Sequence, residues 1–317
     1  MGTVVMDILL NNLMWMDRYD VRLSGYLIIL VCFNFVPGCS GLSKSEKGNV
    51  RHMAVLFSST IDGNWDICRF DMDSKSLTNL TQTLQVHERF PCWNPINQSV
   101  IYGTNLGELI EFRQNGSNKT IAAEQNVTYT NPRVSPDGRY LAYISYMIQG
   151  TTEDGDIYLL DMATGKNQLQ VKLPGHQFNP GWSRDGNYLV FMSGERRGAY
   201  DIWMVRSDGS EPKAVIESDY FDNQPDLSPD GKQMVFTSNR TGDCEIWLCN
   251  LKTGNLKQLT NHPGVDEYPR WSSDGSQILF TSYRQGYYQV WVMNADGTKQ
   301  RPLIKGDFDA RDGEWVF

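Results

Sequence analysis

The chain has 317 residues, and its 29 Lys and Arg against 37 Asp and Glu give a formal net charge of −8. Nonspecific nucleic-acid binding needs a basic face that replaces phosphate counterions, so this charge argues against that class of function. The cysteines outside the N-terminal region do not recur at a fixed place in the repeats described below, which favours buried free thiols over a disulfide framework at Cys68, Cys92, Cys244 and Cys249.

The N-terminal residues are expected to direct export. Leu27 to Val36 form a nearly unbroken apolar run, which is shorter than the roughly 20 residues of a membrane span and fits the core of a signal peptide. The following Val36-Pro37-Gly38-Cys39 is similar to a bacterial lipobox, in which the cysteine carries the lipid. We therefore predict a signal peptide over residues 1–39, lipidation at Cys39, a polar tether over 40–52, and a place in the periplasm or at the cell surface, anchored to a membrane by the lipid. An uncleaved anchor and plain secretion are the alternatives.

A block of about 44 residues recurs six times between Met53 and Phe317. Each copy holds four short apolar stretches, rich in Val, Ile, Phe, Tyr and Trp, that are separated by Asp-Gly, Asn-Gly or Thr-Gly turns. Such stretches predict four antiparallel strands, and this spacing is typical of propeller blades. The copies align on the residue before the first turn, which is Trp93, Val134, Trp182, Leu227, Trp271 and Trp315. The pattern predicts an all-β domain over residues 53–317, a six-bladed β-propeller of four-stranded antiparallel blades.

The order of strands predicts how the ring closes. The repeats start at Met53 to Phe57, which matches a second strand, and the chain ends on Gly313 to Phe317, which matches a first strand. The C-terminal strand is therefore expected to complete the first blade. Such a clasp leaves no unpaired sheet edge at the seam.

The repeat resembles a known family. Ser-Pro-Asp-Gly at Ser135 to Gly138 and at Ser228 to Gly231, with Asp-Ile-Tyr from Asp156 and Asp-Ile-Trp from Asp201, is similar to the PD40 or WD40-like repeat of the TolB-type six-bladed propeller. The resemblance covers residues 53–317 and implies the fold more specifically than the function, because this propeller serves binding proteins, protease regulatory domains and some enzymes. Full-length TolB carries an α/β domain before its propeller, and we expect this chain to lack it.

Turn chemistry separates two sides of the predicted ring. The first-to-second and third-to-fourth turns are tight, whereas the second-to-third loops and the connections between blades vary, and binding residues usually lie on such loops. We place the functional surface on this loop side, at the mouth of the central channel. The predicted binding residues are His87, Glu88, Arg89, Tyr129, Tyr146, His176, Gln177, Asp222, Asp266, Glu267 and Asp309.

Two interpretations of these residues stay open. The set leans acidic and would attract a basic peptide segment, a cation or a polar small ligand. Asp222 and Asp266, however, belong to copies that also carry Arg240 and Arg284, so a salt bridge within each blade would explain them as structure. The copy with Glu88 lacks the arginine, which makes Glu88 the better functional candidate.

The functional prediction is an exported, membrane-tethered, monomeric propeller that acts as a protein-binding or assembly module in the cell envelope. No catalytic residue, metal or cofactor is predicted, because the hydrolase, zinc and phosphate-binding motifs are absent from the sequence. The competing class is a periplasmic enzyme, a lyase or glycosidase that acts on a polysaccharide or peptide with paired acids on the loop side. A metal held by His87, His176 and Glu88 is a lesser alternative.

Overall fold

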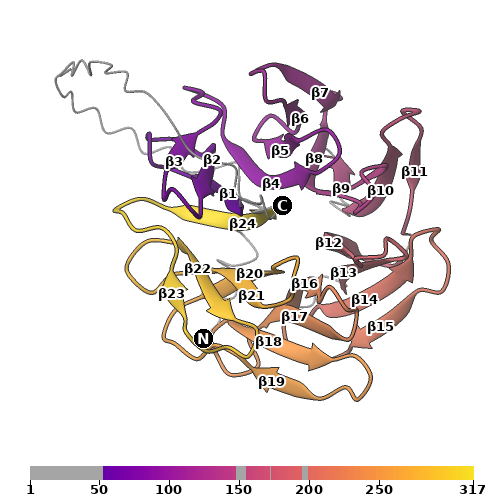
Figure 1. Cartoon of the computed structure of the whole chain (residues 1–317). Helices are drawn as coiled ribbons and strands as arrows, with labels where there is room; N and C mark the ends of the chain where they lie inside the picture. The colour runs from indigo at the N-terminus through magenta and orange to yellow at the C-terminus, as the bar shows by residue number, and fades with distance from the viewer. Residues whose placement is uncertain (1–52, 148–154, 172, 195–198) are drawn as a thin grey trace, which may run out of the picture. The chain divides into compact units, whose positions relative to one another are not determined.

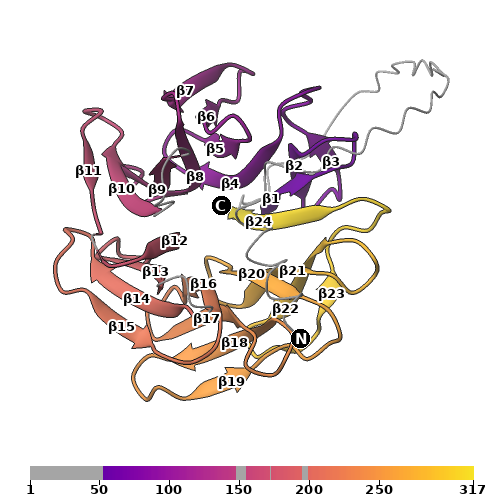
Figure 2. The ribbon, with the colours of Figure 1, turned by 180° about the vertical axis from the view of Figure 1, so that it is seen from behind.

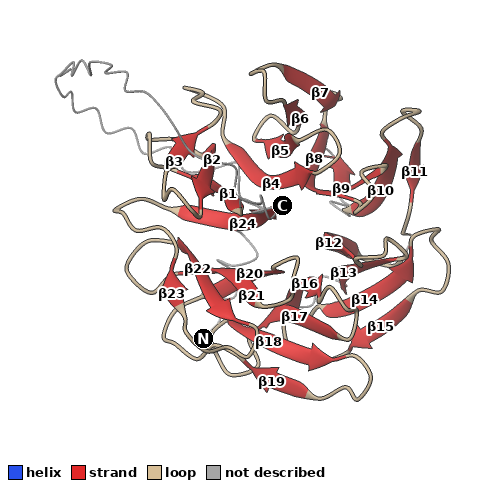
Figure 3. Cartoon of the chain, viewed as in Figure 1, coloured by secondary structure: helices blue, strands red, loops and turns tan. Residues whose placement is uncertain are grey.

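The computed structural model describes residues 53–147, 155–171, 173–194 and 199–317. The regular secondary structure of these residues consists of β-strands (Figure 1 and Figure 3). Among these residues no helix is long and apolar enough to cross a membrane. The predicted signal peptide, Cys39 and the tether lie outside the described residues.

The strands form six four-stranded antiparallel sheets, which we number as blades in chain order. Blade 1 contains β24 (Ala310–Val316), β1 (Ala54–Ser59), β2 (Asp66–Asp71) and β3 (Leu77–Asn79). Blade 2 contains β4 (Glu88–Asn94), β5 (Ser99–Thr104), β6 (Leu109–Phe112) and β7 (Asn118–Ala122). Blade 3 contains β8 (Val127–Val134), β9 (Tyr140–Met147), β10 (Asp156–Asp161) and β11 (Asn167–Leu169). Blade 4 contains β12 (His176–Trp182), β13 (Tyr188–Gly194), β14 (Asp201–Arg206) and β15 (Lys213–Ile216). Blade 5 contains β16 (Asp222–Leu227), β17 (Gln233–Ser238), β18 (Glu245–Asn250) and β19 (Leu256–Gln258). Blade 6 contains β20 (Asp266–Trp271), β21 (Gln277–Ser282), β22 (Gln289–Asn294) and β23 (Arg301–Pro302).

The blades close into a ring, which confirms the fold predicted from the repeats. The first strand of each blade contacts the first strand of the next, from β24 through β4, β8, β12, β16 and β20 back to β24. Figure 1 and Figure 2 show these inner strands around the centre, with the fourth strands outside. The C-terminal β24 pairs with β1, where Trp315 lies opposite Val55. The clasp expected from the strand order is therefore present.

The apolar core lies between neighbouring blades. Trp315 and Phe57 of blade 1 pack in one cluster with Leu279 and Val290 of blade 6. Because both faces of a blade are covered in this way, second strands such as β1 and β5 are buried along their whole length. Each core is therefore formed by two neighbouring blades, and the burial of the apolar side chains of one blade depends on the blades beside it.

Every inner strand carries the same β-bulge. A residue with a left-handed backbone, at a φ between 50° and 59°, is followed by proline in five blades and by Gly313 in β24. The left-handed residues are Phe90, Asn131, Asn179, Gln224, Tyr268 and Asp312. A bulge re-aims the side chains that follow it.

Candidate binding surfaces

The turns between first and second strands are held by their own side chains. Ser135 Oγ donates to Asp137 Oδ1 at 2.6 Å and accepts the Tyr140 amide at 2.9 Å. The same arrangement recurs at Ser183 with Asp185, Ser228 with Asp230 and Ser272 with Asp274. The hydroxyl of Ser135 also lowers the pKa of the Asp137 carboxyl. These polar groups are therefore engaged within the turn.

The second-to-third loops lie on the opposite side, beside the connections that lead into the inner strands. The Asn105 amide donates to the His87 carbonyl at 2.9 Å, and the Tyr283 amide donates to the Val265 carbonyl at 2.9 Å. We call this the loop side and the other the turn side. The predicted binding residues are all at or near the loop-side ends of strands.

Two of the predicted acids belong to structural salt bridges. Arg240 Nη2 lies 2.8 Å from Asp222 Oδ1, and Arg284 Nη2 lies 2.5 Å from Asp266 Oδ2, with both carboxyls buried. The Arg240 guanidinium also lies over the Trp247 ring, at 5.0 Å from its centroid. The structural alternative inferred from the sequence is confirmed at both positions.

Glu88 has a different environment. Leu106 stands at the position that Arg240 holds in blade 5, and Glu88 accepts hydrogen bonds from Thr81 Oγ1 at 2.7 Å and Thr83 Oγ1 at 3.0 Å instead. The residue is 1% exposed, and burial raises the pKa of its carboxyl to about 7. Glu88 is therefore an internal acid next to the loop surface, not an exposed rim charge.

Arg89 and Glu267 join their blades to the closing strand. Arg89 Nε lies 2.6 Å from Asp312 Oδ2, and Arg311 pairs with Glu267. All four side chains are at most 10% exposed. Both predicted residues are therefore buried in ion pairs across the seam.

The two predicted histidines lie in separate environments. His87 Nδ1 accepts the Trp65 amide at 3.3 Å, and burial lowers the pKa of its imidazole. His176 is 4% exposed and stacks on Phe178 with ring centroids 5.7 Å apart. Within the described residues no group of three His, Cys, Asp or Glu side chains is placed to hold a metal ion.

The remaining predicted residues are buried or half-buried. Tyr129 is buried and packs edge-on against Tyr143, with ring centroids 5.7 Å apart. The buried Gln177 donates through Nε2 to the Gly175 carbonyl at 2.7 Å. Tyr146 and Asp309 are half-buried, and Asp309 Oδ1 accepts the Tyr288 amide at 2.9 Å.

Exposed apolar side chains gather on the loop side. Of the twelve large hydrophobic residues exposed in the described part of the chain, eight lie in loop-side loops or at the loop-side end of a strand. These loop-side hydrophobics are Ile61, Leu84, Leu106, Met147, Leu169, Tyr220, Tyr283 and Tyr287. Leu84 is 94% exposed and Leu106 63%. The other four of the twelve lie on the turn side, and they are Leu77, Ile96, Leu256 and Phe317. The acidic pattern did not identify this surface, and the isolated Leu and Tyr in polar loops are the signal that could have done so.

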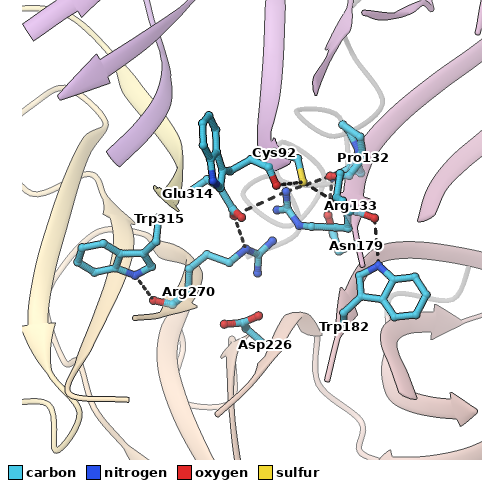
Figure 4. Close-up of polar contacts among 12 residues, drawn as sticks. Cys92, Pro132, Arg133, Asn179, Trp182, Asp226, Arg270, Glu314 and Trp315 are labelled. Carbon is cyan, nitrogen blue, oxygen red and sulfur yellow. Dashed lines mark hydrogen bonds and ion pairs between the residues drawn. The ribbon is translucent and has the colours of Figure 1, made fainter. Parts of the chain in front are cut away.

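A second set of residues, which sequence reasoning missed, meets at the centre of the ring. These central-ring residues follow the proline or glycine of each bulge, and they are Glu314, Cys92, Arg133, Gly181, Asp226 and Arg270. Figure 4 shows Glu314, Arg133 and Arg270 pointing toward one another, with Asp226 close by. Glu314 Oε2 lies 3.9 Å from Arg133 Nη1 and 3.8 Å from Arg270 Nε. The X-Pro-X pattern that recurs in the inner strands is the sequence signal that could have identified these central-ring residues.

The four described cysteines are free and buried, as the sequence indicated. Burial raises the pKa of the Cys68 and Cys92 thiols to about 12. Cys92 Sγ accepts the Val134 amide of the next blade at 3.1 Å. These thiols therefore pack between and within blades and are protonated at neutral pH.

Six four-stranded blades with recurrent Ser-X-Asp-Gly turns define a six-bladed β-propeller of the PD40 type. The model of the TolB β-propeller domain matches residues 108–247 and 241–315, which is more than half of the chain. The chain therefore belongs to the TolB β-propeller family, as the resemblance of its repeats predicted.

Curated relatives match part of the chain. The protein TolB homolog of Chlorobium luteolum is 33% identical over 125 residues, which cover 39% of this chain and 27% of that protein. An uncharacterized protein of Agrobacterium fabrum is 36% identical over 104 residues, which cover 33% of this chain and 34% of that protein. The chain therefore aligns with only about a third of the length of these relatives.

Solved structures share the fold. TolB from Acinetobacter baumannii superposes with a TM-score of 0.71 at 17% identity, over 84% of this chain and 67% of that chain. An oligogalacturonate lyase from Vibrio parahaemolyticus superposes with a TM-score of 0.59 at 16% identity, over 80% of this chain and 74% of that chain. At these identities the likeness is one of fold, which serves both binding proteins and enzymes.

Proposed function

We propose that this chain is a protein-binding module of the cell envelope that contacts its partner through the loop side of the propeller. The observation that carries the proposal is that most of the exposed large hydrophobics lie on the loop side, because an excess of exposed apolar side chains on one face is typical of interaction surfaces. Membership of the TolB β-propeller family supports a periplasmic binding role. The buried salt bridges of Asp222 and Asp266 support it as well, since these acids stabilise loops and are not free for acid–base chemistry.

The surface is tested by capturing a partner from detergent-solubilised envelope with the full chain and measuring binding kinetics of variants. The double change Leu84→Ser and Leu106→Ser should weaken binding by about 2 kcal/mol or more, mainly through faster dissociation, because both side chains are exposed anchors beside blades 1 and 2. Thermal stability should stay the same.

The matched control is Ile96→Ser. Ile96 is 65% exposed on the turn side, so this change removes from the opposite surface an apolar side chain that is exposed to the same extent as Leu106. Binding should be unchanged in the control. If the Ile96 variant loses the partner while the double variant keeps it, the binding side has been assigned wrongly.

We further propose export, with a lipid on Cys39 that tethers the propeller to a membrane facing the periplasm or the cell surface. Support comes from the apolar run Leu27 to Val36 and the lipobox-like Val36-Pro37-Gly38-Cys39. Two acyl chains on one residue would be enough for stable anchoring. The half-buried Tyr146, His87 and Asp309 would then border the partner on the loop side.

Palmitate labelling and fractionation test the anchor. Cys39→Ser should abolish labelling and move the protein to the soluble fraction, whereas Cys32→Ser, inside the apolar run, should keep both label and membrane association. Labelling that survives the loss of Cys39 would refute lipidation at this residue.

A further inference from the structure

The exposed charges of the loop side are almost all negative. Among the described residues, six exposed acids and one exposed base lie in loop-side loops and connections. The acids are Asp62, Glu124, Glu217, Asp219, Asp243 and Asp307, and the base is Lys305. On the turn side, the exposed charged residues in the turns and at the adjoining strand ends are eight acids and twelve bases. The two sides therefore differ in the sign of their exposed charge.

The protein does not neutralise the exposed acids of the loop side. None of the six makes a salt bridge with another described residue. On the turn side, by contrast, the exposed Glu211 lies 3.1 Å from Arg206 Nε. The buried loop-side acids Asp222 and Asp266 also have arginine partners. The uncompensated negative charge of the loop side therefore lies at its surface.

Some of these acids lie next to the exposed loop-side hydrophobics. Asp62 directly follows Ile61 in the loop between β1 and β2, and Asp219 directly precedes Tyr220 in the connection to β16. Ile61 is 37% exposed and Tyr220 is 46% exposed. A partner that packs on these apolar side chains therefore brings its own charges close to the carboxylates.

The loop between β21 and β22 adds aromatic rings to this surface. Tyr283 and Tyr287 are 43% and 38% exposed. Asp309 Oδ1 accepts the Tyr288 amide at 2.9 Å, so the loop adjoins a connection that carries one of the exposed acids. Within the protein, the Arg311 guanidinium lies 3.9 Å from the centroid of the Tyr288 ring. Exposed tyrosine rings and carboxylates are both groups that an arginine side chain contacts favourably.

We propose that the loop side binds a cationic segment of its partner protein, in which apolar residues alternate with arginines. This inference rests on the proposed function, because it names the chemistry of the partner that the loop side contacts. The apolar residues of the segment pack on the loop-side hydrophobics, and its arginines compensate the exposed acids. The negative surface also attracts such a segment before contact, which raises the association rate.

Three synthetic peptides of equal length test this chemistry with the full chain. One alternates Arg with Leu, the second has Glu in place of Arg, and the third has Ser in place of Leu. In fluorescence anisotropy at about 20 mM salt, where screening is weak, the Arg–Leu peptide should bind at least about tenfold more tightly than either of the others. Equal affinity for the Glu–Leu or the Arg–Ser peptide overturns the proposal.

Charge-reversal variants then locate the Arg–Leu peptide. The double change Asp219→Lys and Asp243→Lys should weaken its binding about tenfold or more, mainly through slower association, and the loss should shrink as salt is added. The matched control is Asp73→Lys with Glu211→Lys, which reverses two exposed acids on the turn side. The control should bind as the parent does. Equal losses in the two variants, or no loss in the loop-side variant, overturn the proposal.

The captured partner separates this inference from the proposed function. The loop-side charge variant should also lose affinity for that partner at low salt. If it binds the partner as the parent does while Leu84→Ser with Leu106→Ser binds weakly, the loop side is the binding surface but the cationic segment is refuted. A partner that both variants retain refutes the loop side as the binding surface.

Discussion

The acids that begin the inner strands on the loop side differ in their partners. Asp222 and Asp266 meet an arginine of their own blade, whereas Glu88, whose blade has Leu106 at that position, accepts only from Thr81 and Thr83 in the connection from blade 1 among these contacts. No cation accompanies the buried Glu88 carboxyl in these contacts. Its pKa is therefore raised, to about 7, by burial.

The raised pKa of Glu88 predicts a pH dependence of stability. The unfolded carboxyl has a pKa of about 4.3, so between roughly pH 4 and pH 7 the folded protein holds a proton that the unfolded chain has released. This contribution to stability is complete below the unfolded pKa and is lost as the pH rises through the folded pKa. Glu88→Gln should therefore flatten the fall in the free energy of unfolding between pH 5 and pH 8, by on the order of 2 kcal/mol.

Urea denaturation of parent and variant at several pH values measures this effect. Glu217→Gln, which changes an exposed residue in the connection before β16, is the control and should keep the slope of the parent. Identical slopes in parent and Glu88→Gln would mean that Glu88 titrates normally in the folded protein.

Sequence periodicity predicted where these acids stand along the chain but not which way their side chains turn. The matched arginines at positions 240 and 284 correctly indicated salt bridges. The missing arginine distinguished Glu88 from the other acids but did not indicate its burial, because Thr81 and Thr83, which supply the donors, lie in a different copy of the repeat. Contacts between blades depend on residues that no single repeat contains.

At the scale of elements, β24 is joined by side-chain contacts to both neighbouring blades. Arg311 pairs with Glu267 of blade 6, Asp312 with Arg89 of blade 2, and the Trp315 indole donates to the Arg270 carbonyl at 3.2 Å. Backbone pairing with β1 joins the strand to its own blade. The closing strand is thus held from three directions.

Trp315→Ala should lower the free energy of unfolding by about 3–5 kcal/mol, because the ring is 2% exposed in the core between blades 1 and 6. Phe317→Ala, two residues further on, removes an aromatic side chain that is 41% exposed and should cost less than about 1 kcal/mol. Chemical denaturation of both variants compares the costs. Equal costs would show that the seam contributes no more than an exposed end.

The elements themselves were the most predictable part of the molecule. Short apolar stretches and Asp-Gly turns have local causes, namely side-chain alternation and the positive φ that glycine tolerates, so strands and turns could be placed from the sequence. The bulges could not, because residues such as Phe90 and Tyr268 rarely adopt a left-handed backbone. Their conformation is imposed by the packing of inner strands, and the central ring that depends on it was missed.

At the scale of the whole molecule, each core is shared by two blades, so no blade has a complete core of its own. The propeller should therefore unfold in one cooperative transition. Tryptophan fluorescence and far-ultraviolet circular dichroism, recorded on the same urea titration, should give coincident curves. Two separated transitions would instead show that groups of blades are stable alone.

The six inner strands share one bulge, so their backbones are nearly alike. The ion pairs of Arg311, Asp312 and Glu314 with the neighbouring blades therefore specify the position of β24 in the ring. The same charged partners are present in every other molecule of this chain. When two chains refold together at high concentration, the β24 of each chain can pair with the same acids and arginines in the other chain. Assembly of the ring then competes with reciprocal strand exchange, and dilution is what favours the closed monomer.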